Sequence, residues 1–175
     1  MNIQEIVKNN IRNIPDFPQK GIQFKDITTA IKDPKILSLI IDWFYNQLKD
    51  SRIDYVIGLE SRGFIFAPTI AYKLGAGFIP IRKPGKLPAK VESADYDLEY
   101  GSDSIEIHAD SIEPGKKVAI IDDLLATGGT AAAACDLIKK IGGEIEAIAF
   151  MLELTSLKGR EKLPANIKTY SLAQY

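Results

Sequence analysis

The sequence has few of the residues on which several common functions depend. Of its 175 residues, one is a cysteine, Cys135, and one is a histidine, His108. A single cysteine excludes an internal disulfide and is typical of a reducing compartment, and the two residues are too few for a zinc site of cysteine and histidine. The formal net charge is −1, so we expect no general attraction to nucleic acid or to an anionic membrane.

The chain also lacks targeting and membrane-spanning patterns. Its opening, MNIQEIVKNNIRNIPDF, has neither a basic region nor a continuous apolar stretch, so we expect no signal peptide. No run approaches the roughly 18 apolar residues that a transmembrane helix needs. We therefore expect a soluble, cytoplasmic protein that folds as one domain, residues 1–175.

The first half of the chain alternates helical and strand-like patterns. Apolar residues at helical spacing predict a short helix after the N-terminus, and residues 16–29, DFPQKGIQFKDITT, are expected to form an ordered loop. Asp33 as N-cap and Pro34 at the first helical position predict a helix to Leu48. A strand at 53–58, a helix at 64–74 that Gly75 stops, and a strand at 77–83 follow as a β-α-β unit. Pro80 indicates that the last strand is ending or exposed there.

The second half repeats this alternation after an interruption. From Lys83 to Asp103 the pattern is lost, and a loop this long is usually functional or disordered. Residues 104–110 alternate as a half-buried strand, 117–122 form an apolar strand, and a helix and a strand at 144–154 complete a second β-α-β unit. The C-terminal stretch 155–175 gives no clear assignment.

These elements predict an α/β fold with an open, mainly parallel sheet and helices on both faces. In such sheets ligands bind beyond the carboxyl ends of the strands. Three loops follow predicted strands, LESRG, RKPGK and DDLLATGGT, and we expect them to face a common crevice.

The loop ATGGT, residues 126–130, has the composition of an anion site. Gly128 and Gly129 allow a tight turn and a close approach to a ligand. The first amides of the next helix and the hydroxyls of Thr127 and Thr130 would form a cradle for a phosphate monoester. The loop is not a Walker A motif, and the chain has no GxGxxG fingerprint, which disfavours an NTPase and a dinucleotide-dependent dehydrogenase.

Charged residues flank this loop and the other two. Asp122 and Asp123 either cap a loop beside a solvated partner or accept hydrogen bonds from sugar hydroxyls. Arg62 is either an ordinary surface arginine or an anion ligand. The loop after the next strand adds three cations. Arg82 suits bidentate phosphate contacts, and Lys83 and Lys86 supply flexible positive charge. Together these residues fit a phosphorylated ribose that carries a diphosphate, with Mg²⁺ bridging the substrate oxygens.

The stretch VAIIDDLLATGGT, residues 118–130, resembles the 5-phosphoribosyl 1-pyrophosphate (PRPP) binding motif of the type I phosphoribosyltransferases. The resemblance extends over nearly the whole chain, because DFPQKGIQFKDIT, GLESRGF, IRKPGKLP, LEYG and ELTSLKGREKL are similar to segments of the adenine-specific branch of this family. It implies a purine salvage enzyme that uses Mg²⁺, transfers the 5-phosphoribosyl group from PRPP to adenine, and releases AMP and pyrophosphate. It also implies a homodimer.

The resemblance assigns roles to individual residues. The ribose hydroxyls would be held by Asp122 and Asp123, and pyrophosphate by Arg82 and its neighbours. Adenine would lie between Phe24 and Leu124. The base edge would face main-chain groups of Gln23, Phe24 and Lys25; the 5-phosphate would be held by Ala126, Thr127, Gly128, Gly129 and Thr130; the pyrophosphate loop would be Glu60, Ser61, Arg62 and Gly63, with a cis peptide bond between Glu60 and Ser61.

Two covering parts are implied as well. Residues 1–33 would form a small N-terminal hood over the base, and residues 83–103 a mobile lid that carries Glu99 and Tyr100. Glu99 is the candidate group to manage protonation at the base edge. Residues 89–91 read Ala-Lys-Val where many members of the family carry Gly-Pro-Thr or a similar sequence, a departure that concerns the dynamics of the lid and not the chemistry.

Two other interpretations stay open at this stage. One is a phosphoribosyltransferase for another base, such as a 6-oxopurine or orotate, which only the base pocket distinguishes. The other is a PRPP-sensing regulator that binds without catalysis, although the sequence shows neither an added DNA-binding segment nor a basic face.

Overall fold

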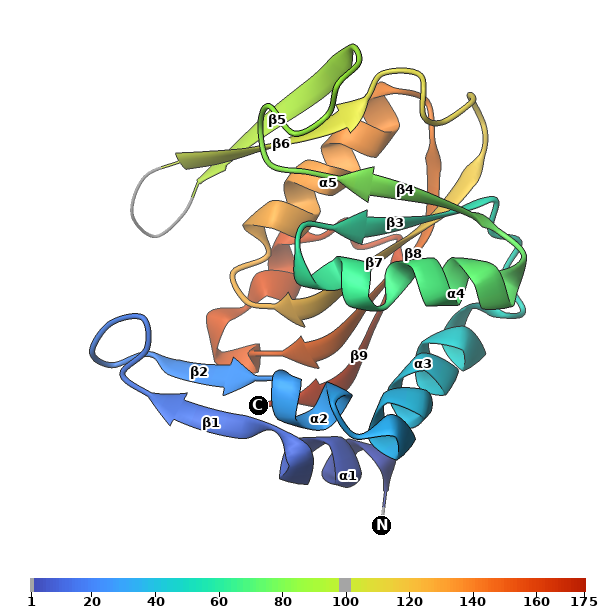
Figure 1. Ribbon diagram of the computed structural model, residues 1–175. Helices are drawn as coiled ribbons and strands as arrows, with labels where there is room; N and C mark the ends of the chain where they lie inside the picture. The colour runs from blue at the N-terminus through green and yellow to red at the C-terminus, as the bar shows by residue number, and fades with distance from the viewer. Residues whose placement is uncertain (1, 98–101) are drawn as a thin grey trace.

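The computed structural model describes residues 2–97 and 102–175, and its centre is a parallel sheet in the order β4-β3-β7-β8-β9 (Figure 1). Every neighbouring pair in this sheet runs parallel. Its strands are β3 (Tyr55–Leu59), β4 (Gly77–Ile81), β7 (Lys117–Leu125), β8 (Glu144–Glu153) and β9 (Lys168–Gln174). The predicted open, parallel α/β sheet is confirmed.

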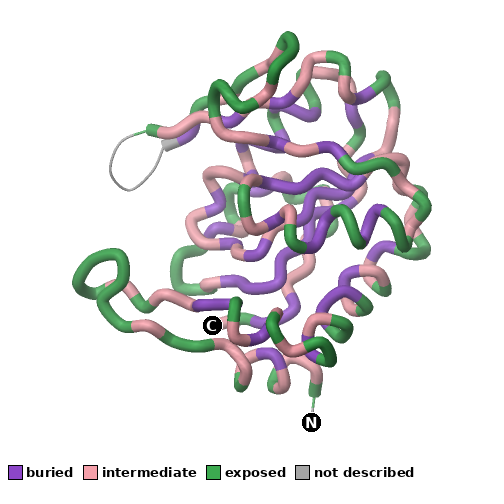
Figure 2. The backbone as a smooth tube through the Cα atoms, in the orientation of Figure 1, coloured by how far each residue is buried: buried purple, intermediate pink, exposed green. Residues whose placement is uncertain are grey.

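Helices cover both faces of the sheet. They are α1 (Ile3–Asn10), α2 (Thr28–Ile31), α3 (Pro34–Leu48), α4 (Ala67–Leu74) and α5 (Gly129–Lys140), with short 3₁₀ turns η1 (Arg62–Ile65), η2 (Thr155–Leu157) and η3 (Gly159–Lys162). One apolar core joins α1, α3 and α4 to the sheet around Phe44 and Phe66, and a second joins α5 around Phe150. The central strands are therefore buried on both sides (Figure 2), which explains the continuous apolar run at the start of β7.

Local sequence signals set the ends of several elements. The side chain of Asp33 accepts hydrogen bonds from the backbone N–H groups of Lys35 and Ile36, at 2.8 and 3.3 Å, and so caps α3 as predicted. Gly75 ends α4 in a left-handed conformation with φ of 67°. Pro80 lies in β4, which forms one edge of the sheet, so its missing N–H interrupts no interior ladder.

Each of the two segments that the sequence predicted as loops contains one strand of a β-hairpin, at 23–26 and at 91–97, and those predictions were wrong in this respect. The strand predicted at 104–110 is confirmed by the strand observed at 102–108. β1 (Arg12–Pro15) pairs with β2 (Gln23–Asp26), and β5 (Val91–Asp97) pairs with β6 (Ser102–His108). The strands of the first hairpin are short and mostly exposed, so they show no clear apolar alternation. The second hairpin packs on α5 and is joined to the end of β4 by backbone hydrogen bonds between Arg82 and Glu106.

Among the described residues, no helix combines the length and the apolar character that crossing a membrane requires.

Candidate active site

A cleft at the carboxyl ends of β3, β4 and β7 contains three adjoining pockets. The loop pocket, of about 80 Å³, is enclosed by the loop after β7. The cationic pocket, of about 400 Å³, is lined by the loops after β3, β4 and β7. The hairpin pocket, of about 550 Å³, opens against β2. Leu124 lines all three pockets, so they adjoin one another and a single ligand can extend across them.

The loop pocket is built from residues 126–130, which we call the β7–α5 loop. Gly128 is the N-cap of α5 and has φ of +79°, a left-handed conformation that favours glycine. No side chain caps this helix, and no backbone carbonyl in the described part of the chain accepts from the amides of Thr127 or Gly128. The first amides of α5 also lack partners within the helix. Backbone N–H groups without partners therefore lie at the N-terminus of α5, the positive end of the helix dipole, and such an arrangement binds phosphate. The whole predicted cradle lines this pocket, namely Ala126, Thr127, Gly128, Gly129 and Thr130.

The two adjacent carboxylates lie at the mouth of the cationic pocket. Asp123 is 4% exposed, and its Oδ2 lies 2.7 Å from Nε of Arg62. Asp122 accepts a hydrogen bond from the backbone N–H of Asp123 at 2.9 Å. Burial, together with the charge of Asp123, raises the pKa of Asp122 well above its usual range. Burial also raises the pKa of Asp123, and the Arg62 guanidinium opposes that rise. Arg62 is thus the counter-charge that favours the ionised form of Asp123 inside the cleft.

The loop after β3 packs tightly against the end of β7. The peptide bond between Glu60 and Ser61 is cis, as the resemblance predicted. A Cβ atom on Gly63 would lie 2.7 Å from the carbonyl oxygen of Ile121 and 3.1 Å from Oδ1 of Asp122. Only glycine allows this approach, which brings Arg62 against Asp123.

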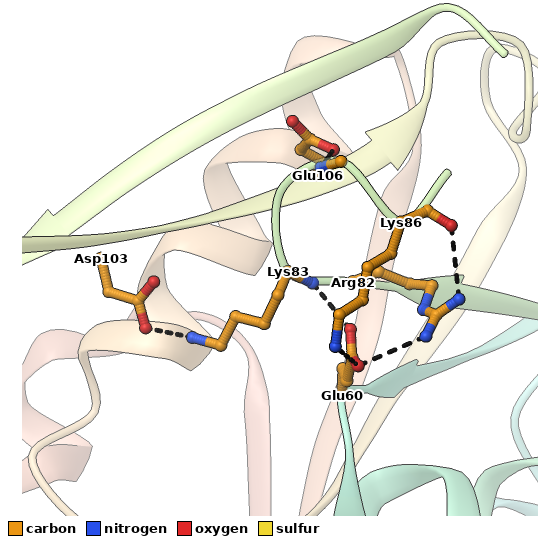
Figure 3. Close-up of polar contacts among 7 residues, drawn as sticks. Glu60, Arg82, Lys83, Lys86, Asp103 and Glu106 are labelled. Atoms are coloured by element: carbon orange, nitrogen blue, oxygen red, sulfur yellow. Dashed lines mark hydrogen bonds and ion pairs between the residues drawn. The ribbon is translucent and has the colours of Figure 1, made fainter. Parts of the chain in front are cut away.

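Glu60 gathers the predicted pyrophosphate ligands around its carboxylate (Figure 3). It accepts from Nζ of Lys86 at 2.6 Å, from the backbone N–H of Lys83 at 2.8 Å and from Nη2 of Arg82 at 3.3 Å. Burial alone would raise the pKa of Glu60, but these hydrogen bonds outweigh it and lower the pKa to about 2. The Glu60 carboxylate lines the cationic pocket and holds two cations beside it, although Arg82 and Lys86 themselves do not line that pocket.

The side chain of Lys83 points away from Glu60 and towards the second hairpin (Figure 3). Its Nζ lies 2.7 Å from the Tyr96 hydroxyl and also contacts the Asp103 carboxylate. The Tyr96 hydroxyl lies 3.1 Å from Oδ2 of Asp103. The same residue thus lines the cationic pocket and ties it to β5 and β6.

The hairpin pocket suits a flat, apolar ligand with polar edges. Phe24 and Leu124, which the resemblance placed around the base, both line it, as do Gln23 and Lys25. The guanidinium of Arg62 lies 5.4 Å from the centre of the Phe24 ring. Within the described residues β2 pairs with β1 alone, so its other edge offers backbone donors and acceptors.

The structure adds cleft residues that the sequence did not predict. Leu154, Leu157 and Tyr175 line the hairpin pocket, and the Lys25 ammonium lies 4.2 Å from the centre of the Tyr175 ring. The segment ELTSLKGREKL contributed to the family resemblance, but its composition suggested no particular role. Glu99 and Tyr100 lie outside the described residues.

The cleft is compatible with a magnesium ion held largely by a substrate. Among the described residues, no three or more histidines, cysteines, aspartates or glutamates gather as a protein-built metal site requires. Glu60 and Asp122 line the cationic pocket, and Glu60 is already paired with cations. Mg²⁺ usually keeps several waters and needs only one or two carboxylates besides phosphate oxygens, so the donors present fit it.

Comparisons with known proteins agree with this geometry. Residues 28–172 match the family model described as a phosphoribosyl transferase domain. The chain is 55% identical to adenine phosphoribosyltransferase of Clostridium botulinum, over 97% of this chain and 98% of that protein. A crystal structure of adenine phosphoribosyltransferase from Rhodothermus marinus superposes with a TM-score of 0.94 at 47% identity, over 99% of this chain and 98% of that one.

A second similar structure contains ligands. It is the Saccharomyces cerevisiae adenine phosphoribosyltransferase complexed with D-2,5-dideoxy-2,5-imino-altritol 1,6-bisphosphate and adenine. It superposes with a TM-score of 0.92 at 42% identity, over 97% of this chain and 98% of that one.

Proposed function

The chain belongs to the phosphoribosyltransferase family, and from this membership we propose that it is a purine salvage enzyme specific for adenine. It transfers the 5-phosphoribosyl group of PRPP to adenine and releases AMP and pyrophosphate. The high identity to adenine phosphoribosyltransferases along nearly the full chain supports this activity.

The observation that carries the proposal is the sequence of pockets around Leu124. A cradle of free amides, a polar pocket lined by Arg62, Lys83 and three carboxylates, and a mostly apolar pocket with a phenylalanine adjoin one another. These three environments match the 5-phosphate, the diphosphate and the base of the two substrates.

Individual residues take these roles in the proposal. The 5-phosphate binds the β7–α5 loop, the pyrophosphate binds Ser61, Gly63, Arg82 and Lys86, and the ribose hydroxyls bind the aspartates. The backbone groups on the free edge of β2 form hydrogen bonds with the polar edge of adenine, while Phe24 and Leu124 contact the two faces of the base. The Tyr100 and Lys83 side chains close on the substrate from the side of the second hairpin. This last role is supported by the contact of Lys83 with both the cationic pocket and the hairpin.

The reaction breaks the bond between the anomeric carbon and pyrophosphate and forms a bond from that carbon to N9 of adenine. Positive charge develops on the ribose ring and negative charge on the leaving pyrophosphate. Asp122 and Asp123 stabilise the first charge, and Arg62 and Arg82 stabilise the second. The proton lost by adenine passes to Glu99, whose carboxylate lies on the lid in this proposal.

Magnesium supplies a further positive charge on the diphosphate when PRPP carries it into the cleft. The ion would be held mainly by PRPP and water, and Asp122 would be the carboxylate left to support it, because Asp123 is paired with Arg62 and Glu60 with lysine and arginine. The Asp122 and Asp123 pair also keeps the ribose side of the cleft able to accept hydrogen bonds.

Two covering parts complete the site. Residues 1–33 act as a hood over the base, supported by the position of β2 along the hairpin pocket. Residues 83–103 act as a mobile lid, whose closure would exclude water from an activated ribose.

We also propose that the enzyme works as a homodimer in the cytoplasm. Exposed apolar side chains near the β4 edge of the sheet support self-association, namely Ile65, Tyr72 and Phe78. The single, buried Cys135 is compatible with a reducing compartment.

A base panel tests the activity. With PRPP and Mg²⁺, adenine should yield AMP and pyrophosphate, measured by chromatography and by a pyrophosphate-coupled assay. Robust turnover of hypoxanthine, guanine or orotate with none of adenine would contradict the base specificity. Binding of PRPP without turnover of any base would instead favour a PRPP-sensing regulator.

A further inference from the structure

The segment from Leu154 to Leu163, LTSLKGREKL, contributes Leu154 and Leu157 to the hairpin pocket, and its second half lies directly against the β7–α5 loop. A Cβ atom on Gly159 would lie 2.2 Å from the carbonyl oxygen of Ala126 and 2.9 Å from the amide nitrogen of Gly128. A Cβ atom on Gly128 would lie 2.2 Å from the carbonyl oxygen of Gly159. The two backbones therefore touch at a place where neither can carry a side chain.

An ion pair between the half-exposed Arg160 and the buried Glu153 fixes the segment at this place. The Nε of Arg160 donates to Oε1 of Glu153 at 3.1 Å, and its Nη1 donates to the carbonyl oxygen of Thr169 at 2.7 Å. Its Nη2 also contacts Glu153 and reaches Oγ of Ser171 at 3.0 Å. Glu153 is 5% exposed and ends β8, while Thr169 and Ser171 belong to β9. The guanidinium thus fastens the residue after Gly159 to two strands of the sheet.

This support matters because the β7–α5 loop has few other constraints. Its ends are fixed by β7 and α5, but no side chain caps α5. The loop presents its amides to the cleft, and the direction of each N–H depends on the backbone conformation around Gly128, which is left-handed. A shift of the backbone behind the loop would turn these donors away from a bound phosphate.

We propose that Gly159 and the Arg160–Glu153 pair are positioning residues for the 5-phosphate site. Gly159 forms the back wall of the β7–α5 loop, and the ion pair holds that wall in place. The inference rests on the proposed function, since it assumes that this loop binds the 5-phosphate of the substrate. None of these three residues lines the pockets of the cleft.

Calorimetric titration of the full chain with two ligands separates this role from general damage. Ribose 5-phosphate probes the β7–α5 loop, and pyrophosphate with Mg²⁺ probes the cationic pocket. Gly159→Ala should weaken the binding of ribose 5-phosphate at least about tenfold, because charge-assisted hydrogen bonds to the phosphate are lost. The affinity for pyrophosphate should stay within about twofold of the wild-type value.

Two further variants keep the test decisive if Gly159→Ala folds poorly. Arg160→Lys retains the charge but cannot form the forked contacts of the guanidinium. It should therefore also weaken the binding of ribose 5-phosphate but not of pyrophosphate, by a smaller factor than Gly159→Ala. Gly75→Ala is the matched control, since it adds the same methyl group at the far end of α4, where nothing lies within 4 Å. It should bind both ligands as the wild type does.

The outcomes are distinct. Equal affinity of wild type and both segment variants for ribose 5-phosphate would overturn the inference, and so would an equal loss for both ligands. A wild-type protein that binds pyrophosphate but not ribose 5-phosphate would instead contradict the assignment of the β7–α5 loop in the proposed function.

Discussion

Three carboxylates are buried among the described residues, and each of them is paired with an arginine. The pairs are Asp26–Arg12, Asp123–Arg62 and Glu153–Arg160. A buried carboxylate without a partner would cost several kcal/mol, so each pair fixes the relative position of two chain segments. One joins the two strands of the first hairpin, one joins the loop after β3 to the end of β7, and one lies behind the β7–α5 loop. All three therefore support the walls of the same cleft.

The Asp123 pair gives a prediction about turnover. Asp123→Asn removes the charge that faces Arg62 and the developing positive charge of the ribose, so kcat should fall about 10²–10³-fold. The melting temperature should change little, because the variant also relieves the cost of burying a charge. Asp42→Asn, which breaks the exposed Lys73–Asp42 pair between α4 and α3, is the control and should have wild-type kinetics. Wild-type kinetics in Asp123→Asn would mean that the pair is purely structural.

The Asp26 pair gives a prediction about pH. Hydrogen bonds from Thr28 and Arg12 lower the pKa of Asp26 from 3.8 to about 2. A carboxyl with a lowered pKa stabilises the fold above its unfolded pKa and loses that contribution as the pH falls towards the folded value. The free energy of unfolding of Asp26→Asn should therefore be below that of the wild type at neutral pH. The difference should shrink between about pH 4 and pH 2, as urea titrations at several pH values would show; a difference independent of pH would contradict this assignment.

At the scale of elements, the sequence predicted those whose ends carry a local signal. Asp33 and Pro34 marked the start of α3, and Gly75 marked the end of α4, because capping depends on the residue itself. β1, β2 and β5 were missed because their pairing depends on a partner strand and their side chains are largely polar or exposed. β9 was missed because it gains its place only by pairing with β8.

The end of α4 gives a prediction about stability. Gly75 has φ of 67°, and no atom lies within 4 Å of the place that a Cβ would take, so only its backbone conformation opposes a side chain. Gly75→Ala should lower the free energy of unfolding by about 1 kcal/mol. Gly75→Asn should lower it by less, since asparagine tolerates the left-handed region better. Urea denaturation of the three proteins measures both values, and equal losses in the two variants would contradict the conformational explanation.

At the scale of the whole molecule, the sequence predicted which loops lie together but not the ion pairs and backbone contacts that fix their positions. The β-α-β pattern brought the loops after β3, β4 and β7 to one edge of the sheet, as the cationic pocket shows. The family resemblance added Phe24 and the cis bond before Ser61, neither of which follows from composition or spacing. The pairing of Lys86 with Glu60, of Lys83 with Asp103, and the wall formed by Gly159 depend on contacts between segments far apart in the chain. No local pattern encodes such contacts.

The central claim is that one cleft holds the 5-phosphate and the diphosphate of PRPP at the same time. The most direct test is a calorimetric titration of the folded protein with PRPP in magnesium buffer. We predict one binding site per chain, with PRPP bound more tightly than either ribose 5-phosphate or pyrophosphate alone, and displaced when both fragments are present. No heat of binding, or a PRPP affinity no greater than that of the better fragment, would contradict the claim.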